Sequence, residues 1–254
     1  MSIRTEVRGA AYWITFDNEK RRNAISFEMY NELCRAMDDA NENENTFITV
    51  FTGAGDYYSS GNDFSLSEMA THFSPEDPDV ESGYSRWMRR LINHGKVLIA
   101  VVNGPAFGVA CTTLGLFDHV VCSDSAYFLC PFTSLGISPE GDSSVTFERI
   151  LGTSYATEML LFSEPMSSQR ALERGLVSKV FPRKEFMLKA TELVDKYAKL
   201  PMHSVLAAKE LTRGSQWRRE MASTHIDECE LLAKLSVDER TADLLMKRFG
   251  KSNL

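Results

Sequence analysis

The chain has 254 residues, of which 43% are hydrophobic, and 35 acidic against 28 basic side chains leave a formal net charge of −7. A chain of this size buries roughly three quarters of its unfolded surface, so it can form one large core. The acidic balance argues against a nucleic-acid-binding surface, which needs clustered basic residues. No apolar segment approaches the ~20 residues of a membrane span. We therefore expect a globular protein that neither binds nucleic acid nor crosses a membrane.

The five cysteines are scattered along the chain and form no CxxC pair. They are Cys34, Cys111, Cys122, Cys130 and Cys229. This pattern is typical of reduced thiols, not of a disulfide framework or a zinc site. The alternating charged residues at the start of the chain do not form a signal peptide either. We expect a reducing compartment and no metal site.

Hydrophobic periodicity predicts an alternation of strands and helices that gives way to helices alone. Strands are expected over 3–9, 11–16, 47–51, 97–102, 118–122, 126–129 and 176–181. Helices are expected over 27–40, 87–92, 144–151, 153–162 and 168–174, and then throughout the chain after residue 182. Ser26 is the expected N-cap of the first helix. The acidic, proline-containing segment 71–82 predicts a mobile surface loop.

The change of pattern divides the chain into an α/β core over residues 1–182 and a helical region over 183–254. Repeated strand–helix units are typical of a parallel-sheet α/β fold. Short strands that end in glycine turns are equally compatible with a stacked β-β-α spiral. Periodicity alone does not separate the two architectures.

Two glycine-containing turns follow predicted strands. One holds Ser60, Gly61 and Asn62 after strand 47–51, and the other holds Gly108 and Val109 after strand 97–102. In each turn a glycine precedes a residue whose backbone N–H would point outward, and the second N–H begins a helix, where unpaired amides favour negative charge. Two such groups that converge would form an oxyanion hole. Ordinary β-turns that need glycine explain the same residues.

A lone acid, Glu140, lies between Pro139 and Gly141, before a helix whose expected N-cap is Ser143 or Ser144. An acid at a helix N-terminus is stabilised by ~0.3–1 kcal/mol through the helix dipole. That explanation requires no catalytic role, and the position taken by itself favours it.

Three motifs together resemble a known family. SSGNDF at 59–64, NGPAFGVA at 103–110 and SPEGDSS at 138–144 have the order and spacing seen in the crotonase superfamily of acyl-CoA enzymes. The segment 20–26 after the first hairpin resembles that family's entry loop. Within the superfamily the chain is most similar to 3,2-enoyl-CoA isomerases of the peroxisomal type. The resemblance implies a crotonase-like β-β-α spiral core and a C-terminal helical region that covers the acyl site or forms a trimer interface.

The resemblance also implies a role for each matching residue. Asn62 and Val109 would donate two backbone N–H groups to the thioester oxygen, and Glu140 would be the base. The residues implied in substrate and coenzyme A binding are Ser60, Gly61, Asn62, Asp63, Phe64 and Gly108, with Lys20 or Arg21 near the CoA phosphates. The residues implied in an apolar acyl pocket are Phe107, Phe132 and Ile137. Such a pocket would exclude water and raise the pKa of Glu140. Asp142 would add repulsion or serve as an N-cap or surface acid.

Hydratases of this family use two glutamates, and the matching positions here are Thr112 and Phe132. Neither side chain can act as a base, so the resemblance implies an isomerase with one carboxylate. Glu140 would take a proton from C2 of a 3-enoyl-CoA, the dienolate charge would collect on the thioester oxygen, and Glu140 would return the proton to C4. This reaction needs no metal or bound redox cofactor, and coenzyme A enters as part of the substrate.

Other functions stay open for the same fold. One is another acyl-CoA reaction, such as dienoyl-CoA isomerisation or thioester hydrolysis. The other is a catalytically silent binding module like those of chromatin-associated relatives, against which Glu140 and the two glycine turns argue. The resemblance further implies a homotrimer or hexamer. Ser252-Asn253-Leu254 is similar to the peroxisomal S-K-L signal, so we expect a peroxisome or, failing that, a mitochondrion.

Overall fold

The chain begins with an antiparallel hairpin, as the alternation of its first residues predicts. In the computed structural model, which describes residues 2–63 and 81–249, β1 (Ile3–Arg8) pairs with β2 (Ala11–Phe16) around Gly9. Ser26 then starts α1 (Phe27–Glu42), and its side chain accepts the N–H of Met29 at 3.3 Å. The predicted N-cap is confirmed.

Two sheets follow from the later strands. The large sheet has the order β1-β2-β3-β4-β6-β9 and is parallel except for the β1–β2 pair. Its further members are β3 (Ile48–Gly53), β4 (Val97–Val102), β6 (His119–Ser123) and β9 (Lys179–Phe181). The small sheet, in the order β5-β7-β8, contains β5 (Ala106–Phe107), β7 (Tyr127–Leu129) and β8 (Met166–Ser167). The chain leaves the large sheet after β4 and again after β6, so it winds as a β-β-α spiral. Of the two predicted architectures, the spiral is confirmed.

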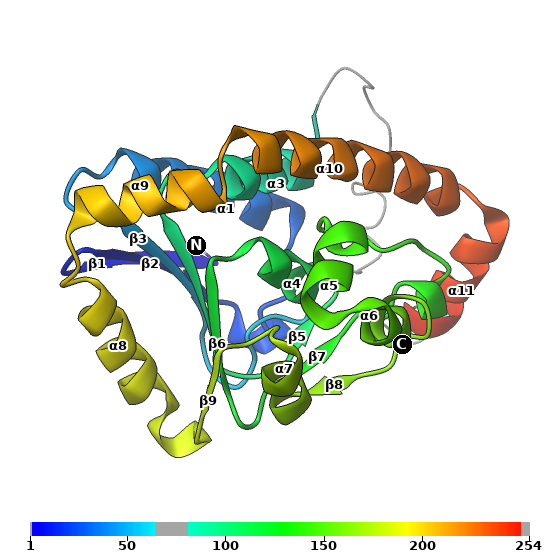
Figure 1. The fold of residues 1–254 in the computed structure, drawn as a ribbon. Coiled ribbons are helices and arrows are strands. Elements are labelled where there is room, and N and C mark those ends of the chain that lie inside the picture. Colours follow the sequence, from blue (N-terminus) through cyan, green and yellow to red (C-terminus); the bar gives the residue numbers. More distant parts are fainter. Residues whose placement is uncertain (1, 64–80, 250–254) are drawn as a thin grey trace.

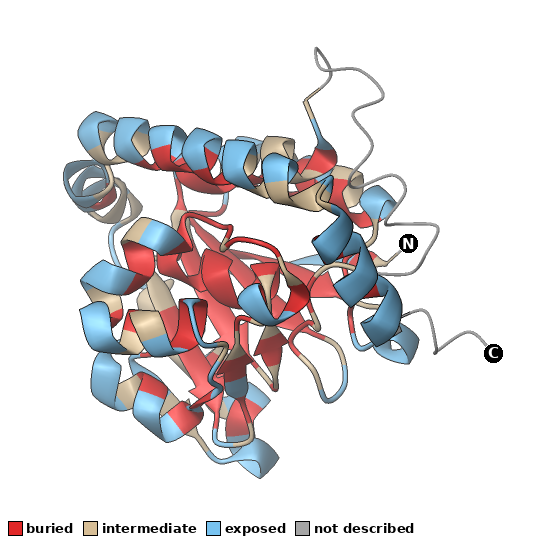
Figure 2. Cartoon of the chain, turned by 90° about the vertical axis from the view of Figure 1, so that its right-hand side faces the viewer, coloured by how far each residue is buried: buried red, intermediate tan, exposed pale blue. Residues whose placement is uncertain are grey.

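Alternate residues of the central strands face two separate cores. Leu98 and Ala100 of β4 belong to the larger core, with α1, α3 (Gly83–Asn93) and the small sheet. Ile99 and Val101 belong to a second core, with α8 (Phe186–Tyr197) and α9 (Met202–Thr212) on the opposite face. The central strands of the large sheet are therefore buried on both faces (Figures 1 and 2).

Short helices connect the two sheets and lead into the C-terminal region. They are α4 (Val109–Thr112) with the 3-10 turn Thr113–Leu116, α5 (Ser143–Leu151), α6 (Thr153–Leu160) and α7 (Ser168–Arg174). The long α10 (Ser215–Ser236) runs across α3 and reaches α5, and α11 (Glu239–Phe249) packs on the 3-10 turn Thr133–Leu135 (Figure 1). No helix within the described ranges is long and apolar enough to cross a membrane.

Several local predictions differ from the structure. The helix expected over 87–92 begins earlier, at Gly83. The strand expected at 176–181 begins only at Lys179, because Gly175 ends α7 in a left-handed conformation and the Val177 N–H donates back to Ala171 at 3.2 Å. The two-residue strands β5 and β8 were not predicted, since so short a strand has no periodicity. Of the predicted mobile loop 71–82, only the last two residues lie inside the described ranges, and Ser82 caps α3.

Candidate active site

The loops that leave β3 and β4 meet at one edge of the large sheet. These strands are parallel neighbours, so the segments after Gly53 and Val102 begin at the same edge. The Gly53 N–H donates to Oδ1 of Asn103 at 3.0 Å. Further along, the Phe107 N–H donates to the carbonyl of Ser59 at 3.0 Å. These bonds bring the two glycine turns together.

Gly61 and Gly108 hold these turns in conformations that L side chains rarely adopt, with φ of +84° and +51°. A Cβ at Gly61 would lie 2.7 Å from the carbonyl oxygen of Phe107 and 3.6 Å from Cα of Gly108. The turns are thus in van der Waals contact. The residues that follow the glycines are Asn62 and Val109. Within the described part of the chain neither backbone N–H donates a hydrogen bond, so both can serve an acceptor that enters the site.

Glu140 reaches the same place from the segment before α5. Its side chain is buried, and the Asn62 amide donates to its Oε1 at 3.3 Å. Asn62, whose backbone N–H follows the first glycine turn, therefore also contacts the carboxyl of Glu140 through its side chain. Gly141 packs on α4, since a Cβ there would lie 2.4 Å from Oγ1 of Thr112. Three segments distant in sequence form one site.

The pKa of Glu140 is raised from 4.5 to about 8. Burial is the largest cause because it disfavours the charged form, and the negative charge of Glu228 raises the pKa further. A hydrogen bond with Tyr84 acts in the opposite direction. The expected rise is confirmed, although the repulsion comes from Glu228 and not from Asp142. Such a carboxyl can both accept and return a proton near neutral pH.

Two tyrosines orient this carboxyl and its amide partner. Tyr30 of α1 donates to Oδ1 of Asn62, which leaves the amide nitrogen for Glu140. Tyr84 of α3 accepts the N–H of Gly141 at 3.0 Å, so its own proton can face Glu140. Burial raises the pKa of both phenols well above the ordinary value. Both therefore stay neutral and act as O–H donors.

The N-terminus of α5 is capped differently from the prediction. Asp142 occupies the N-cap position, but its side chain makes no capping hydrogen bond. Glu228 of α10 instead accepts the N–H of Asp142 at 2.7 Å and the N–H of Ser144 at 2.9 Å. Ser143 donates its hydroxyl to the carbonyl of Glu140 at 2.7 Å. The expectation that Ser143 or Ser144 caps the helix is wrong, because a carboxylate from another helix accepts these amides.

Asp142 is not a surface acid either. It is fully buried at a φ of +58°, and neither carboxyl oxygen has a hydrogen-bond partner within the described residues. Burial, and to a lesser extent Glu228, raises its pKa to about 8. We call Glu140, Asp142 and Glu228 the buried carboxyl cluster. It joins the loop before α5 to α10.

The polar residues predicted to bind substrate lie around the first turn. Ser60 and Asp63 are partly buried. Arg21 pairs with Asp63 at 2.6 Å while 53% of its side chain stays exposed, and Lys20 is exposed next to it. Arg21 therefore stands at the outer rim of the turn, and Lys20 precedes it in the chain. Phe64, also predicted here, lies outside the described residues.

The apolar residues predicted to form the acyl pocket differ in burial. Phe132 and Ile137 are buried, and both precede Glu140 on the same segment. Phe107 is partly exposed and packs against the rings of Tyr57 and Tyr127, with centroids 6.2 and 5.2 Å away. Phe132 and Ile137 thus lie on the segment that leads to Glu140, and Phe107 lies beside the second turn.

Thr112 and Phe132 occupy the positions that the resemblance assigns to the two hydratase glutamates. Both are buried. The Thr112 hydroxyl donates back to the carbonyl of Gly108 at 3.3 Å, within its own helical turn. Neither residue offers a carboxylate that could activate a water molecule.

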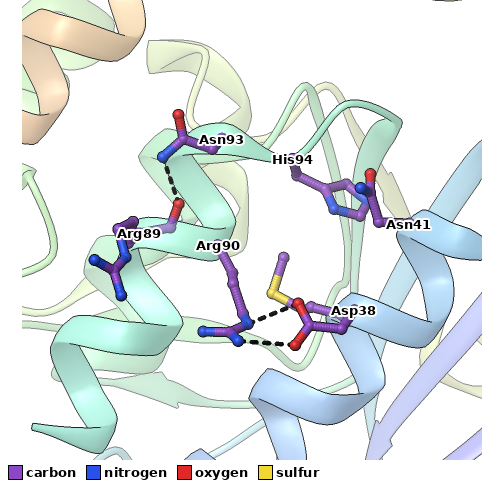
Figure 3. A pocket seen from close by; sticks show the side chains of 7 residues that line it. Asp38, Asn41, Arg89, Arg90, Asn93 and His94 are labelled. Atoms are coloured by element: carbon purple, nitrogen blue, oxygen red, sulfur yellow. Dashed lines mark hydrogen bonds and ion pairs between the residues drawn. The ribbon is translucent and has the colours of Figure 1, made fainter.

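A surface hollow of about 300 Å³ lies between α1 and α3 and does not include Glu140 (Figure 3). Its lining residues are Met37, Asp38, Asn41, Arg89, Arg90, Asn93 and His94. Asp38 and Arg90 form two hydrogen bonds of 2.8 Å. His94 is hydrogen-bonded to Thr49, and burial lowers its pKa to about 3. Arg89 pairs with Glu81, which does not line the hollow, so each charged or titratable side chain of the lining has a partner. Over residues 2–63 and 81–249 there is also no group of three or more potential metal ligands.

Sequence reasoning missed Tyr30, Tyr84 and Glu228. The tyrosines are indistinguishable from core aromatics at helical spacing, so no local signal marks them. Glu228 does carry one, since it follows Met221 and Thr224 on the buried stripe of α10. A charged residue on such a stripe is rarely buried without a partner, and this could have identified it.

A spiral of two sheets with two free backbone N–H groups beside a buried carboxyl defines a protein of the crotonase fold. The chain matches the family described as enoyl-CoA hydratase/isomerase over residues 6–246. It belongs to that family. Among solved structures, it superposes with a TM-score of 0.91 and 25% identity on an enoyl-CoA hydratase/isomerase from Pseudoalteromonas atlantica, over 99% of this chain and 98% of the other.

Curated relatives are more similar in sequence. The chain is 39% identical to enoyl-CoA delta isomerase 2 of Rattus norvegicus over 240 residues, which cover 92% of this chain and 59% of the relative. It is 39% identical to the peroxisomal enoyl-CoA delta isomerase 3 of Mus musculus over 220 residues, which cover 85% of this chain and 68% of the relative. The chain thus spans about three fifths of the length of the rat relative.

Proposed function

We propose that this chain is an enoyl-CoA isomerase that converts a cis or trans 3-enoyl-CoA to the trans-2-enoyl-CoA during the β-oxidation of unsaturated fatty acids. The observation that carries the proposal is the buried carboxyl of Glu140, bonded at 3.3 Å to the side chain of Asn62. The backbone N–H of Asn62 donates to no group among the described residues. The names of the rat and mouse relatives support it. The absence of carboxylates at Thr112 and Phe132 favours isomerisation over hydration.

In the first step the Glu140 carboxylate takes a proton from C2 of the substrate. The electron pair of the C–H bond moves into the thioester and gives a dienolate with its charge on the thioester oxygen. The N–H groups of Asn62 and Val109 stabilise that oxygen as charge develops, and loss of one such donor typically costs ~2.7–4 kcal/mol of barrier.

In the second step the protonated Glu140 gives the same proton to C4. The double bond then lies between C2 and C3, in conjugation with the thioester. A pKa of about 8 suits both transfers, because the group is a usable base and a usable acid near that pH. Burial of Phe132 and Ile137 on the same segment would keep water from the dienolate.

Coenzyme A enters this reaction as part of the substrate, and the chemistry uses no metal or bound redox cofactor. The exposed Lys20 and Arg21 are suited to contact its phosphates at the rim of the first turn. Further parts of the proposal are a homotrimer or hexamer and a peroxisomal location. The Ser252-Asn253-Leu254 end, on which the location rests besides the mouse relative, lies outside the described residues.

The test is a direct assay with trans-3-hexenoyl-CoA, in which the conjugated 2-enoyl thioester is followed by ultraviolet absorbance. Glu140→Gln keeps the shape of the side chain but cannot accept a proton, and we expect kcat to fall by about 10²–10⁴-fold. Glu148→Gln, an exposed acid on the same α5, is the matched control and should retain wild-type turnover. CoA-ester binding by both variants is checked by calorimetry.

Three results would contradict the proposal. Turnover that survives in Glu140→Gln would place the base elsewhere, with Asp142 the next candidate. Wild-type protein that binds the CoA ester without isomerising it would favour dienoyl-CoA isomerisation or thioester hydrolysis, which the same preparation can be assayed for. Binding without any of these reactions would indicate a catalytically silent module.

A further inference from the structure

Glu228 reaches the catalytic segment from α10, in the C-terminal helical region. Its two carboxylate oxygens divide between two amides: Oε2 accepts the N–H of Asp142 at 2.7 Å, and Oε1 accepts the N–H of Ser144 at 2.9 Å. The Ser144 hydroxyl adds a third bond to Oε1 at 2.6 Å. Glu228 is 6% exposed. Because the carboxylate is buried and accepts three hydrogen bonds, this contact is a fixed part of the fold and not a chance pair at the surface.

The segment to which Glu228 is hydrogen-bonded also carries Glu140. Asp142 stands two residues after Glu140 in a left-handed conformation that is strained for a non-glycine residue. Its own side chain does not cap α5. Something else must therefore hold this turn, and the bonds from Glu228 supply the missing acceptors at the helix start.

The charges around Glu228 are mostly acidic. The groups whose pKa Glu228 influences are Glu140 and Asp142 before α5, Tyr84 of α3 and Cys229 of its own helix, which also buries His225. Burial raises the pKa of Glu228, while its three hydrogen bonds act against that rise. Asp142 has no donor within the described residues. Of the buried carboxyl cluster, Glu228 is thus the member that best holds a negative charge.

We propose that Glu228 is a positioning residue for the reaction, which holds the Glu140 segment in its working geometry through the amides of Asp142 and Ser144. The inference rests on the proposed isomerase function. Its charge has a second consequence, because a fixed anion near Glu140 disfavours a second negative charge there. Glu228 thereby acts on Glu140 in two ways. It holds the backbone amides of Asp142 and Ser144, and its negative charge raises the pKa of Glu140. In this proposal it does not contact the substrate.

The experiment compares Glu228→Gln, Ser144→Ala and the control Glu230→Gln, an exposed acid on the same helix. Glu228→Gln loses the anion and presents an NH₂ to one of the two amides. We expect kcat to fall about tenfold with KM within about threefold, and the acid limb of kcat/KM to move to lower pH by at least about half a unit. Ser144→Ala keeps the negative charge of Glu228, so the acid limb of its kcat/KM profile should stay at the wild-type pH. Glu230→Gln should match wild type throughout.

Amide hydrogen exchange supplies a readout that does not depend on activity. Loss of the acceptor should make the Asp142 and Ser144 amides of Glu228→Gln exchange at least about tenfold faster than in wild type. An infrared titration of the Glu140 carboxyl, identified by difference from Glu140→Gln, should show its pKa lowered in the same variant. If wild type shows no isomerase activity, the proposed function fails, while these two measurements still decide the role of Glu228.

Unchanged exchange together with an unmoved pH limb in folded Glu228→Gln would overturn the inference. A fall in kcat with neither change would assign Glu228 a structural role only. Glu228→Asp covers the case in which Glu228→Gln does not fold, since it keeps the charge on a shorter side chain. It should keep the pH limb near that of wild type but exchange faster at Asp142 and Ser144, and slow exchange at both amides would contradict the proposal.

Discussion

Asn62 serves the site with two different groups. Its backbone N–H, just after Gly61, has no acceptor over residues 2–63 and 81–249, while its side-chain amide donates to Glu140. Tyr30 fixes the amide by donating to its oxygen. In the proposed mechanism, this double contact would couple the position of the oxyanion donor to the protonation of Glu140. The two contributions can be separated, because a truncated side chain leaves the backbone N–H in place.

We predict that Asn62→Ala moves the acid limb of kcat/KM to higher pH. A hydrogen bond to the carboxylate favours its ionised form, so removal of the amide raises the pKa of Glu140 above about 8. Activity at pH 7 should fall about tenfold, and the loss should shrink above pH 9. Rates with 3-hexenoyl-CoA across pH 6–10 measure this. Asn93→Ala, an exposed asparagine, is the control. A limb that stays or moves to lower pH would refute the prediction.

At the scale of elements, the two glycine turns make different demands. Gly61 has a positive φ and no room, because a Cβ would meet the Phe107 carbonyl at 2.7 Å. Gly108 has a positive φ, but no atom of the described part of the chain lies within 4 Å of a Cβ placed there. Gly9, in the β1–β2 hairpin, is likewise strained without a contact. The three positions separate backbone strain from close packing.

We predict that Gly61→Ala is the most damaging of three matched substitutions. It must push the second turn away, so kcat should fall by about 10²-fold or more as the donors separate. Gly108→Ala adds strain only and should lower kcat less. Gly9→Ala should cost about 1 kcal/mol of stability and leave kcat unchanged. Thermal unfolding and the isomerase assay measure the series, and equal kcat for the Gly61 and Gly9 variants would show that the turns do not form the oxyanion site.

At the scale of the whole molecule, folding buries the carboxyl cluster beneath α10 and against α3. Burial raises the pKa of each of its three members. The folded protein therefore binds protons that the unfolded chain has released, and stability from these groups falls as pH rises from the unfolded pKa through the folded one. For Glu140 that window runs from 4.5 to about 8.

We predict that Glu140→Gln becomes more stable relative to wild type as pH rises through this window. The difference should be small below pH 4.5 and reach on the order of a few kcal/mol above pH 8. The other groups, including His94 and His225, titrate in both proteins and largely cancel. Thermal unfolding between pH 4 and 9 checks this. A difference in Tm that does not vary with pH would mean that the Glu140 carboxyl is not protonated in the folded state.

Local patterns along the chain determine most of its secondary structure. The hairpin, α1 with its Ser26 cap, the central strands and the glycine turns follow from alternation, helical spacing and turn residues, which act over a few neighbours. The order of the three motifs was enough to identify the family. The start of β9 and the existence of β8 could not be predicted, because a helix end and a distant strand decide them.

The sequence by itself thus determined the element order, the two turns and the candidate base Glu140. Only the tertiary structure decided that the chain winds between two sheets, that Tyr30 and Tyr84 orient the base with Asn62, and that Glu228 caps α5 in place of Ser143 or Ser144. The physical reason is the separation along the chain of the residues that interact. Secondary structure depends on residues a few positions apart, whereas burial, repulsion between carboxylates and shared hydrogen bonds depend on segments that only the packed fold brings within contact distance.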